Sequence, residues 1–128
     1  MQSGIARGVR IPGVGHPITI QPAGERVIVR AGGRVVAETT AALILREARL
    51  APVYYIPLRD VDRAAIERST HTSHCPYKGD ASYYDLATGD GVVPNAIWEY
   101  LEPYDSVGEI AGHVAFYPHL VDISAAPM

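Results

Sequence analysis

The sequence predicts a mainly β fold, built as one compact domain of short strands. With 128 residues, the chain has the length of a single domain that can bury a core. Short runs of β-branched and aromatic residues are separated by glycine, proline and aspartate, which is the pattern of strands joined by turns. Hydrophobic residues at 48% and charged residues at 20% are typical of a globular chain rather than a disordered one.

The N-terminal part begins with a glycine-rich segment and continues as a hairpin. Residues 1–16 lack hydrophobic periodicity and predict a flexible arm, so the domain itself is expected to cover residues 17–124. From Ile18 onward, the runs ITIQ, RVIVR and RVVAE alternate apolar and polar residues, and Gly32-Gly33 separates the last two runs. Two glycines between alternating runs are typical of a tight β-hairpin.

Residues 39–50 can be interpreted in two ways, because their apolar block fits either a short helix or a buried strand. Neither Thr39 nor Thr40 has Glu or Gln three residues later, so no capping box marks a helix, and a strand is favoured. One short helix is expected near residues 60–67, with Asp60 as its N-cap. Further short strands are expected at residues 53–56, 81–86, 92–93, 96–101 and 113–117.

Alternation along the last strands predicts which side chains share a face. Trp98 and Tyr100 are expected on the same face of their strand, which is preceded by a turn at Pro94-Asn95. The strand at residues 113–117 is expected to have two faces, one with His113, Ala115 and Tyr117 and the other with Val114 and Phe116.

Charge and composition limit the classes of function. The formal net charge of -3 gives no basic excess for binding nucleic acid, and no apolar run reaches the roughly 20 residues that span a membrane. The single cysteine cannot form an internal disulfide, and the N-terminus lacks the apolar run of a signal peptide, so a cytoplasmic location is expected. A homodimer is the default expectation, since symmetric dimers are the commonest oligomers.

The charges are distributed unevenly along the chain. Residues 1–68 carry ten arginines and six acidic residues, whereas residues 69–128 carry one lysine and eight acidic residues, which gives net charges of +4 and -7. Such an asymmetry fits a partner-binding surface, and it also fits two halves of one fold that attract each other, which is the favoured interpretation. A protein-interaction module without a pocket is therefore one alternative function.

The stretch from Ser69 to Asp85, STHTSHCPYKGDASYYD, contains the only cysteine, the only lysine and three of the eight tyrosines. Gly79 can supply the positive φ of a turn, with Lys78 at its tip as a contact for a phosphate or carboxylate, or simply facing solvent. Tyrosine and tryptophan can line a pocket, and they can equally form a core. We predict a pocket for a small polar or anionic ligand, lined by Tyr55, Cys75, Tyr77, Lys78, Tyr83 and Trp98.

Cys75 is the candidate catalytic residue of another alternative function, a cysteine-dependent enzyme. Lys78 lies close enough in sequence to favour the thiolate, and His71 and His74 are candidate bases. The competing interpretation is a small buried side chain without a catalytic role. A zinc site is not expected, because an extended segment would place His71 and Cys75 about 13 Å apart and would point His74 away. Neither a metal nor a cofactor is predicted.

Four motifs, PVYYIPLRDV, HTSHCPYKGDASYY, AIWEYLEP and IAGHVAFYPHLVD, resemble in this order a small bacterial family, the domain of unknown function number 427. The resemblance runs from Ile18 to Ile123, and its CPYKG-x-ASYY core is specific. It implies a single, mostly β domain with the tent-like architecture of Mss4-like domains, and it implies no established activity. The family also has a nucleotidyltransferase-like label, which would need Asp60 and Asp62 to hold a divalent metal. The start of a helix explains the same two residues.

Overall fold

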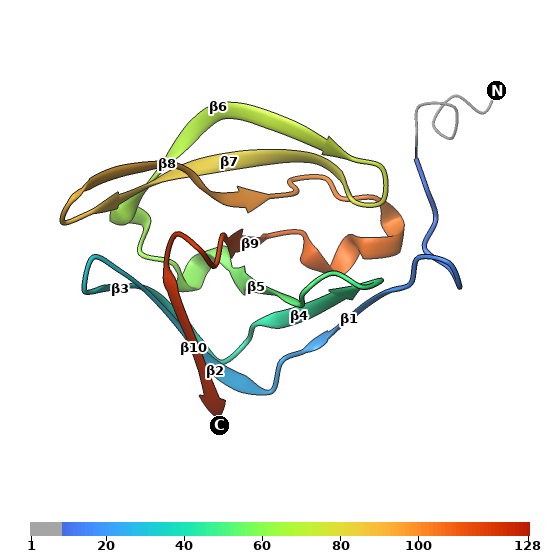
Figure 1. The fold of residues 1–128 in the computed structure, drawn as a ribbon, viewed down its shortest axis with the longest axis horizontal. Coiled ribbons are helices and arrows are strands. Elements are labelled where there is room, and N and C mark those ends of the chain that lie inside the picture. The colour runs from blue at the N-terminus through green and yellow to red at the C-terminus, as the bar shows by residue number, and fades with distance from the viewer. Residues whose placement is uncertain (1–8) are drawn as a thin grey trace.

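The computed structural model describes residues 9–128 and confirms the mainly β fold (Figure 1). The strands are β1 (Ile18–Pro22), β2 (Glu25–Ala31), β3 (Arg34–Thr39), β4 (Leu43–Glu47), β5 (Val53–Pro57), β6 (Ile66–Cys75), β7 (Gly79–Thr88), β8 (Gly91–Glu99), β9 (His113–Phe116) and β10 (Asp122–Pro127). Three short 3-10 segments accompany them: η1 (Leu58–Asp60), η2 (Arg63–Ala65) and η3 (Asp105–Ile110). No helix within the described residues has the length and apolarity needed to cross a membrane.

The strands form two antiparallel sheets. The larger sheet has seven strands in the order β1-β4-β5-β9-β8-β7-β6, and the smaller sheet has three in the order β10-β2-β3. In Figure 1 the β6, β7 and β8 end of the large sheet lies above its β1, β4 and β5 end, with β9 between them. The large sheet therefore curls over itself and has a concave side.

Two clusters of buried side chains occupy the two faces of the large sheet. The first cluster includes Val27 and Val29 of the small sheet together with Leu86 and Ile97, so it joins the two sheets. The second cluster includes Leu45, Tyr55, Tyr83 and Tyr100, and Val107 and Ile110 of η3 belong to it. Strand β9 contributes to both clusters, with Val114 and Phe116 in the first and Ala115 in the second, and Tyr117, directly after the strand, packs against the second. The predicted alternation is confirmed for residues 114–117.

Local sequence signals predicted the N-terminal strands correctly. Strands β2 and β3 pair as a hairpin, and Gly32 and Gly33 at its tip have φ angles of 59° and 76°. A two-residue turn with positive φ at both central positions matches the twist of the strands, and glycine adopts it without steric cost. Strand β4 covers Leu43–Glu47, so the strand interpretation of residues 39–50 is confirmed.

The helix expected near residues 60–67 is wrong in extent. Two isolated 3-10 turns, η1 and η2, replace it, and β6 begins at Ile66. Asp62 rather than Asp60 is the cap, since its carboxylate accepts a hydrogen bond from the backbone N–H of Ala64 at 3.1 Å. A run of this length is too short to be a stable helix alone, and pairing of Ile66 with Leu86 of β7 extends the chain instead.

The turn expected at Pro94-Asn95 is also wrong, because β8 continues through both residues. The strand absorbs an irregularity in its pairing with β7, where the register shifts between Tyr84 and Leu86. Asn95 has a φ of 54°, and its backbone N–H donates to the Asp85 carboxylate at 2.8 Å. A β-bulge stabilised by a side chain therefore stands where local sequence indicated a chain reversal.

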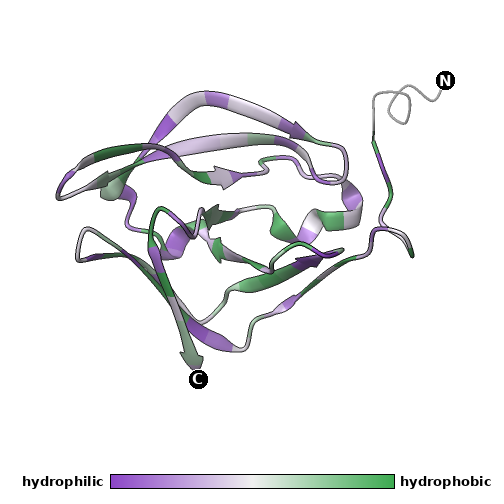
Figure 2. Ribbon diagram, in the orientation of Figure 1, coloured by the Kyte–Doolittle hydropathy of each residue, from purple (hydrophilic) through white to green (hydrophobic). Residues whose placement is uncertain are grey.

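Strand β6 forms one edge of the large sheet, and its sequence is IERSTHTSHC. Figure 2 shows that this strand is largely hydrophilic along its length. Most of its residues are exposed, and it pairs only with β7. Polar and charged side chains on an exposed edge discourage pairing with other chains.

Candidate functional site

A cavity of about 250 Å³ lies against the second core cluster of the large sheet. We call it the aromatic cavity. Strands β4, β5, β7 and β8 supply most of its walls, and the turns after β4, β6 and β9 close it. Its lining residues are Leu45, Glu47, Leu50, Val53, Tyr55, Lys78, Tyr83, Trp98, Tyr100 and Tyr117.

The aromatic cavity contains most of the side chains that the sequence singled out. Cys75 and Tyr77 are not in its lining: Cys75 is half-buried against the second core cluster, and the ring of Tyr77 stacks on His16. Trp98 and Tyr100 both line the cavity, which confirms that they share a face. The predicted residues that the structure brings together here are Tyr55, Lys78, Tyr83 and Trp98.

A buried ion pair forms the charged part of the cavity wall. The Lys78 ammonium donates to Oε1 of Glu47, and the two side chains are only 10% and 9% exposed. Burial by itself raises the pKa of Glu47, but hydrogen bonds from Lys78 and His16 outweigh burial and hold that pKa below its ordinary value of 4.5. Glu47 is therefore an ionised carboxylate beside a cation, and the pair presents an acceptor next to a donor.

His16 completes the surroundings of the ion pair from outside the cavity lining. Its Nε2 lies 2.7 Å from Oε2 of Glu47, and its ring stacks on Tyr77 with centroids 3.9 Å apart. The backbone N–H of Arg10 also donates to the Pro76 carbonyl at 2.7 Å. Of the flexible arm predicted at residues 1–16, residues 1–8 lie outside the described residues, and residues 10 and 16 make these contacts.

The aromatic walls carry several hydroxyl groups. Nε1 of Trp98 donates to the Tyr55 hydroxyl at 3.1 Å, and the Trp98 ring lies 4.5 Å from the ring of Tyr117. Burial raises the pKa of both Tyr55 and Tyr100. Burial and the neighbouring Tyr83 hydroxyl raise the pKa of Tyr117 to about 12. These phenols are neutral near physiological pH, so they can each donate and accept hydrogen bonds.

His71 and His74, the candidate bases for Cys75, contact other residues. Strand β6 is extended, so His71, His74 and Cys75 lie spread along it. His74 Nδ1 is 2.7 Å from the Asp80 carboxylate, and the ring of His71 lies 4.6 Å from that of Tyr83. Within residues 9–128, no group of three or more His, Cys, Asp or Glu side chains is arranged to hold a metal ion. A catalytic Cys75 stays a prediction.

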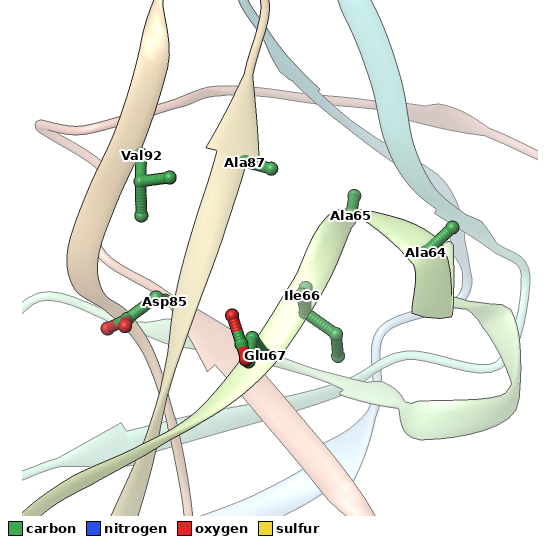
Figure 3. Close-up of a pocket in the computed structure, with 7 residues that line it drawn as sticks. All are labelled: Ala64, Ala65, Ile66, Glu67, Asp85, Ala87 and Val92. Carbon is green, nitrogen blue, oxygen red and sulfur yellow. The ribbon is translucent and has the colours of Figure 1, made fainter.

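A second depression, shown in Figure 3, lies between η2 and the β6–β7–β8 strands. Its polar side chains are two carboxylates, those of Glu67 and Asp85, and Asp85 already accepts a hydrogen bond from the backbone of Asn95. The other lining residues are small or aliphatic: Ala64, Ala65, Ile66, Ala87 and Val92. Of these two places, the aromatic cavity is the stronger candidate site, since it combines buried donors, acceptors and aromatic rings.

The fold and the site define a mainly β domain with an aromatic cavity over a buried Glu–Lys pair. The sequence profile of the family described as a domain of unknown function, DUF427, matches residues 19–126, and the same family is labelled NTP_transf_9. The chain belongs to this family. No curated protein matches it.

Two residues that the nucleotidyltransferase-like label would need have structural roles. Asp60 accepts a hydrogen bond from the Thr39 hydroxyl at 2.7 Å. Asp62 forms an ion pair with Arg34 and caps η2, and the Arg34 hydrogen bond lowers the pKa of Asp62. These contacts explain the Asp-Val-Asp pattern without a metal ion.

Glu47 and His16 are parts of the site that the sequence did not indicate. Glu47 and Lys78 are separated by 31 positions, as are His16 and Glu47, so no short motif contains either pair. One signal for Glu47 was present: in an extended strand it shares a face with the apolar Leu43 and Leu45. A carboxylate that shares a face with the buried Leu45 and the partly buried Leu43 must point inward, where it needs a partner.

Proposed function

We propose that the protein binds a small polar molecule in the aromatic cavity, with the polar group of the ligand on the Glu47–Lys78 pair. The observation that carries this proposal is a buried ion pair that lines a cavity also walled by Trp98 and tyrosines. A volume of about 250 Å³ equals the share of roughly eight molecules of liquid water, so the part of the ligand that lies in this cavity is small.

The charge of the pair favours a ligand without net charge. An anion near the Lys78 ammonium would also approach the ionised Glu47 carboxylate, and a cation near Glu47 would approach Lys78. A group with an adjacent acceptor and donor satisfies both partners at once: its acceptor faces Lys78 and its donor faces Glu47. A primary carboxamide has this arrangement. An anionic ligand, which the sequence left open, is disfavoured unless Glu47 is neutralised.

Binding is a better supported function than cysteine catalysis. The thiol of Cys75 is outside the cavity lining, and Lys78, the cation that would favour its thiolate, is hydrogen-bonded to Glu47. A nucleophile must lie within reach of the bound reactant and of its activating group. Neither condition is supported by the positions of these side chains.

The test compares three probes of equal chain length, butyramide, butyrate and butylammonium, by the fluorescence of Trp98. The chain contains one tryptophan, and it lines the aromatic cavity, so the signal reports on binding beside Trp98. We expect butyramide to bind most tightly. Glu47→Gln should shift the preference toward butyrate, because Lys78 then has no anionic neighbour. Loss of a hydrogen bond to a charged group should weaken butyramide by about tenfold or more.

The matched control is Glu38→Gln, the same chemical change at an exposed ion pair on β3. This control should leave the three affinities unchanged. A probe preference that is identical in the wild type, Glu47→Gln and Glu38→Gln would overturn the proposal, because the ligand would then not contact the ion pair. Glu47→Gln retains the size of the side chain, so a cavity of the same shape is compared.

A further inference from the structure

A second cavity adjoins the aromatic cavity and shares two of its walls. We call it the apolar cavity, and its volume is also about 250 Å³. Val53 and Trp98 line both cavities. The remaining lining residues of the apolar cavity are Ala51, Pro52, Tyr54, Phe116, Pro118 and Ile123. Unlike the aromatic cavity, it has no charged side chain in its lining among residues 9–128.

The pairing of the strands explains why a cavity exists at this place. Strand β5 pairs with β9 only through Ile56 and Pro57. The beginning of β5, from Val53 to Tyr55, pairs with β4 on its other side. The large sheet is therefore split between the beginning of β5 and the end of β9, and backbone pairing does not close it there.

The lining of the apolar cavity comes from both faces of the sheet, as a split requires. Tyr54 and Phe116 belong to the face of the first core cluster. Val53 and Trp98 belong to the opposite face, that of the second core cluster and of the aromatic cavity. The indole of Trp98 also reaches Tyr55 of β5 through its Nε1 hydrogen bond. Trp98 therefore lies at the split, between the aromatic cavity and the apolar cavity.

We infer that the natural ligand is amphipathic: an uncharged polar head lies on the Glu47–Lys78 pair, and a short apolar chain passes Trp98 into the apolar cavity at the β5–β9 split. This inference rests on the proposed function and adds a second subsite to it. The polar subsite fixes the head through hydrogen bonds, and the apolar subsite selects for the chain by burying it. Trp98, shared by both subsites, limits the shape of the molecule at the junction.

The test is a series of straight-chain primary amides from acetamide to octanamide, titrated against full-length protein and followed by Trp98 fluorescence. If the chain enters the apolar cavity, the affinity rises by about fourfold for each added methylene group and then levels off when the cavity is filled. An affinity that does not depend on chain length overturns this inference and leaves the proposed function standing. Absence of binding by every member of the series contradicts both.

Ala51→Asp isolates the apolar subsite. Ala51 is exposed and lines the apolar cavity only, so a carboxylate there opposes an apolar chain without altering the ion pair. We expect this variant to bind acetamide, the shortest member of the series, as the wild type does and to lose the gain of the longer amides. Ala64→Asp is the matched control, the same change at an exposed residue of the Figure 3 depression. Equal chain-length dependence in all three proteins would refute the second subsite.

Discussion

Removing the cation from the buried ion pair is the sharpest test of how the site is held together. Lys78→Met keeps an unbranched side chain of similar length and removes the ammonium group. The Glu47 carboxylate, only 9% exposed, then retains the His16 ring as its hydrogen-bond partner. Breaking a buried pair by removing one partner costs about 3–5 kcal/mol. Because His16 still bonds Glu47 and the cavity can admit water, we expect a loss of about 2–3 kcal/mol.

The double variant separates the charge effect from loss of packing. In Lys78→Met combined with Glu47→Gln, no uncompensated charge is buried, so most of the stability should return. A buried pair replaced by neutral side chains of similar volume is often close to neutral in stability. We therefore expect the double variant to be more stable than either single variant, with a coupling of more than about 1.5 kcal/mol.

Urea unfolding followed by far-UV circular dichroism provides the free energies of unfolding for the four proteins. Lys78→Met should lower the midpoint without changing the slope with denaturant. Two results would refute the reasoning: a loss below about 0.5 kcal/mol in Lys78→Met, which is typical of a surface substitution, or additive losses in the double variant. Either would mean that the pair is solvated rather than buried.

Three further predictions concern single residues. The pKa of Glu47 is lower in the folded than in the unfolded protein, so its contribution to stability is present above its ordinary pKa of 4.5 and is lost as the pH falls through the folded pKa. Glu47→Gln should therefore reduce the loss of stability at acid pH, measured by urea unfolding at several pH values. The same pH dependence in the variant and the wild type would contradict this prediction. Cys75 is half-buried, so Cys75→Ser should lower the free energy of unfolding by about 1 kcal/mol and Cys75→Ala by less. Equal and negligible losses in both variants, measured by urea unfolding, would contradict this prediction. Asn95 has positive φ, so Asn95→Val should cost about 1–2 kcal/mol more than Asn95→Gly in thermal unfolding, and equal melting temperatures would contradict this.

Features that depend on neighbouring residues could be predicted from the sequence. The β2–β3 hairpin is determined by two glycines between alternating runs, and the two faces of β9 are determined by alternation alone. The short run after Asp60 had the local marks of a helix, but pairing of β6 with β7 decided its structure. Local propensity is a weak guide when long-range pairing competes with it.

Two of the edge strands, β6 and β10, were harder to predict than the other strands. Strand β6 is rich in serine, threonine and histidine, and it is held by backbone pairing with β7 rather than by burial of an apolar face. Strand β10, with the sequence DISAAP, pairs with β2 and is mostly exposed. Neither has the hydrophobic pattern on which sequence-based prediction depends.

Only some residues of the candidate site could be predicted from the sequence. Its aromatic residues were identifiable as a group, because tyrosine and tryptophan are concentrated in strands whose alternation fixes their faces. The charged centre was not, because Glu47 meets Lys78 only when β4 and the β6–β7 turn come together in the fold. The position of Tyr77 against His16 likewise depends on where the described part of the N-terminal segment packs.

The most direct test of the account is a crystal structure of the protein soaked with hexanamide. We predict electron density for the amide group between Glu47 and Lys78, with the oxygen toward Lys78 and the nitrogen toward Glu47. The alkyl chain should pass Trp98 toward Ile123. Amide density outside the aromatic cavity, or an aromatic cavity that holds only water at saturating hexanamide, would contradict the central claim that this cavity is a ligand-binding site.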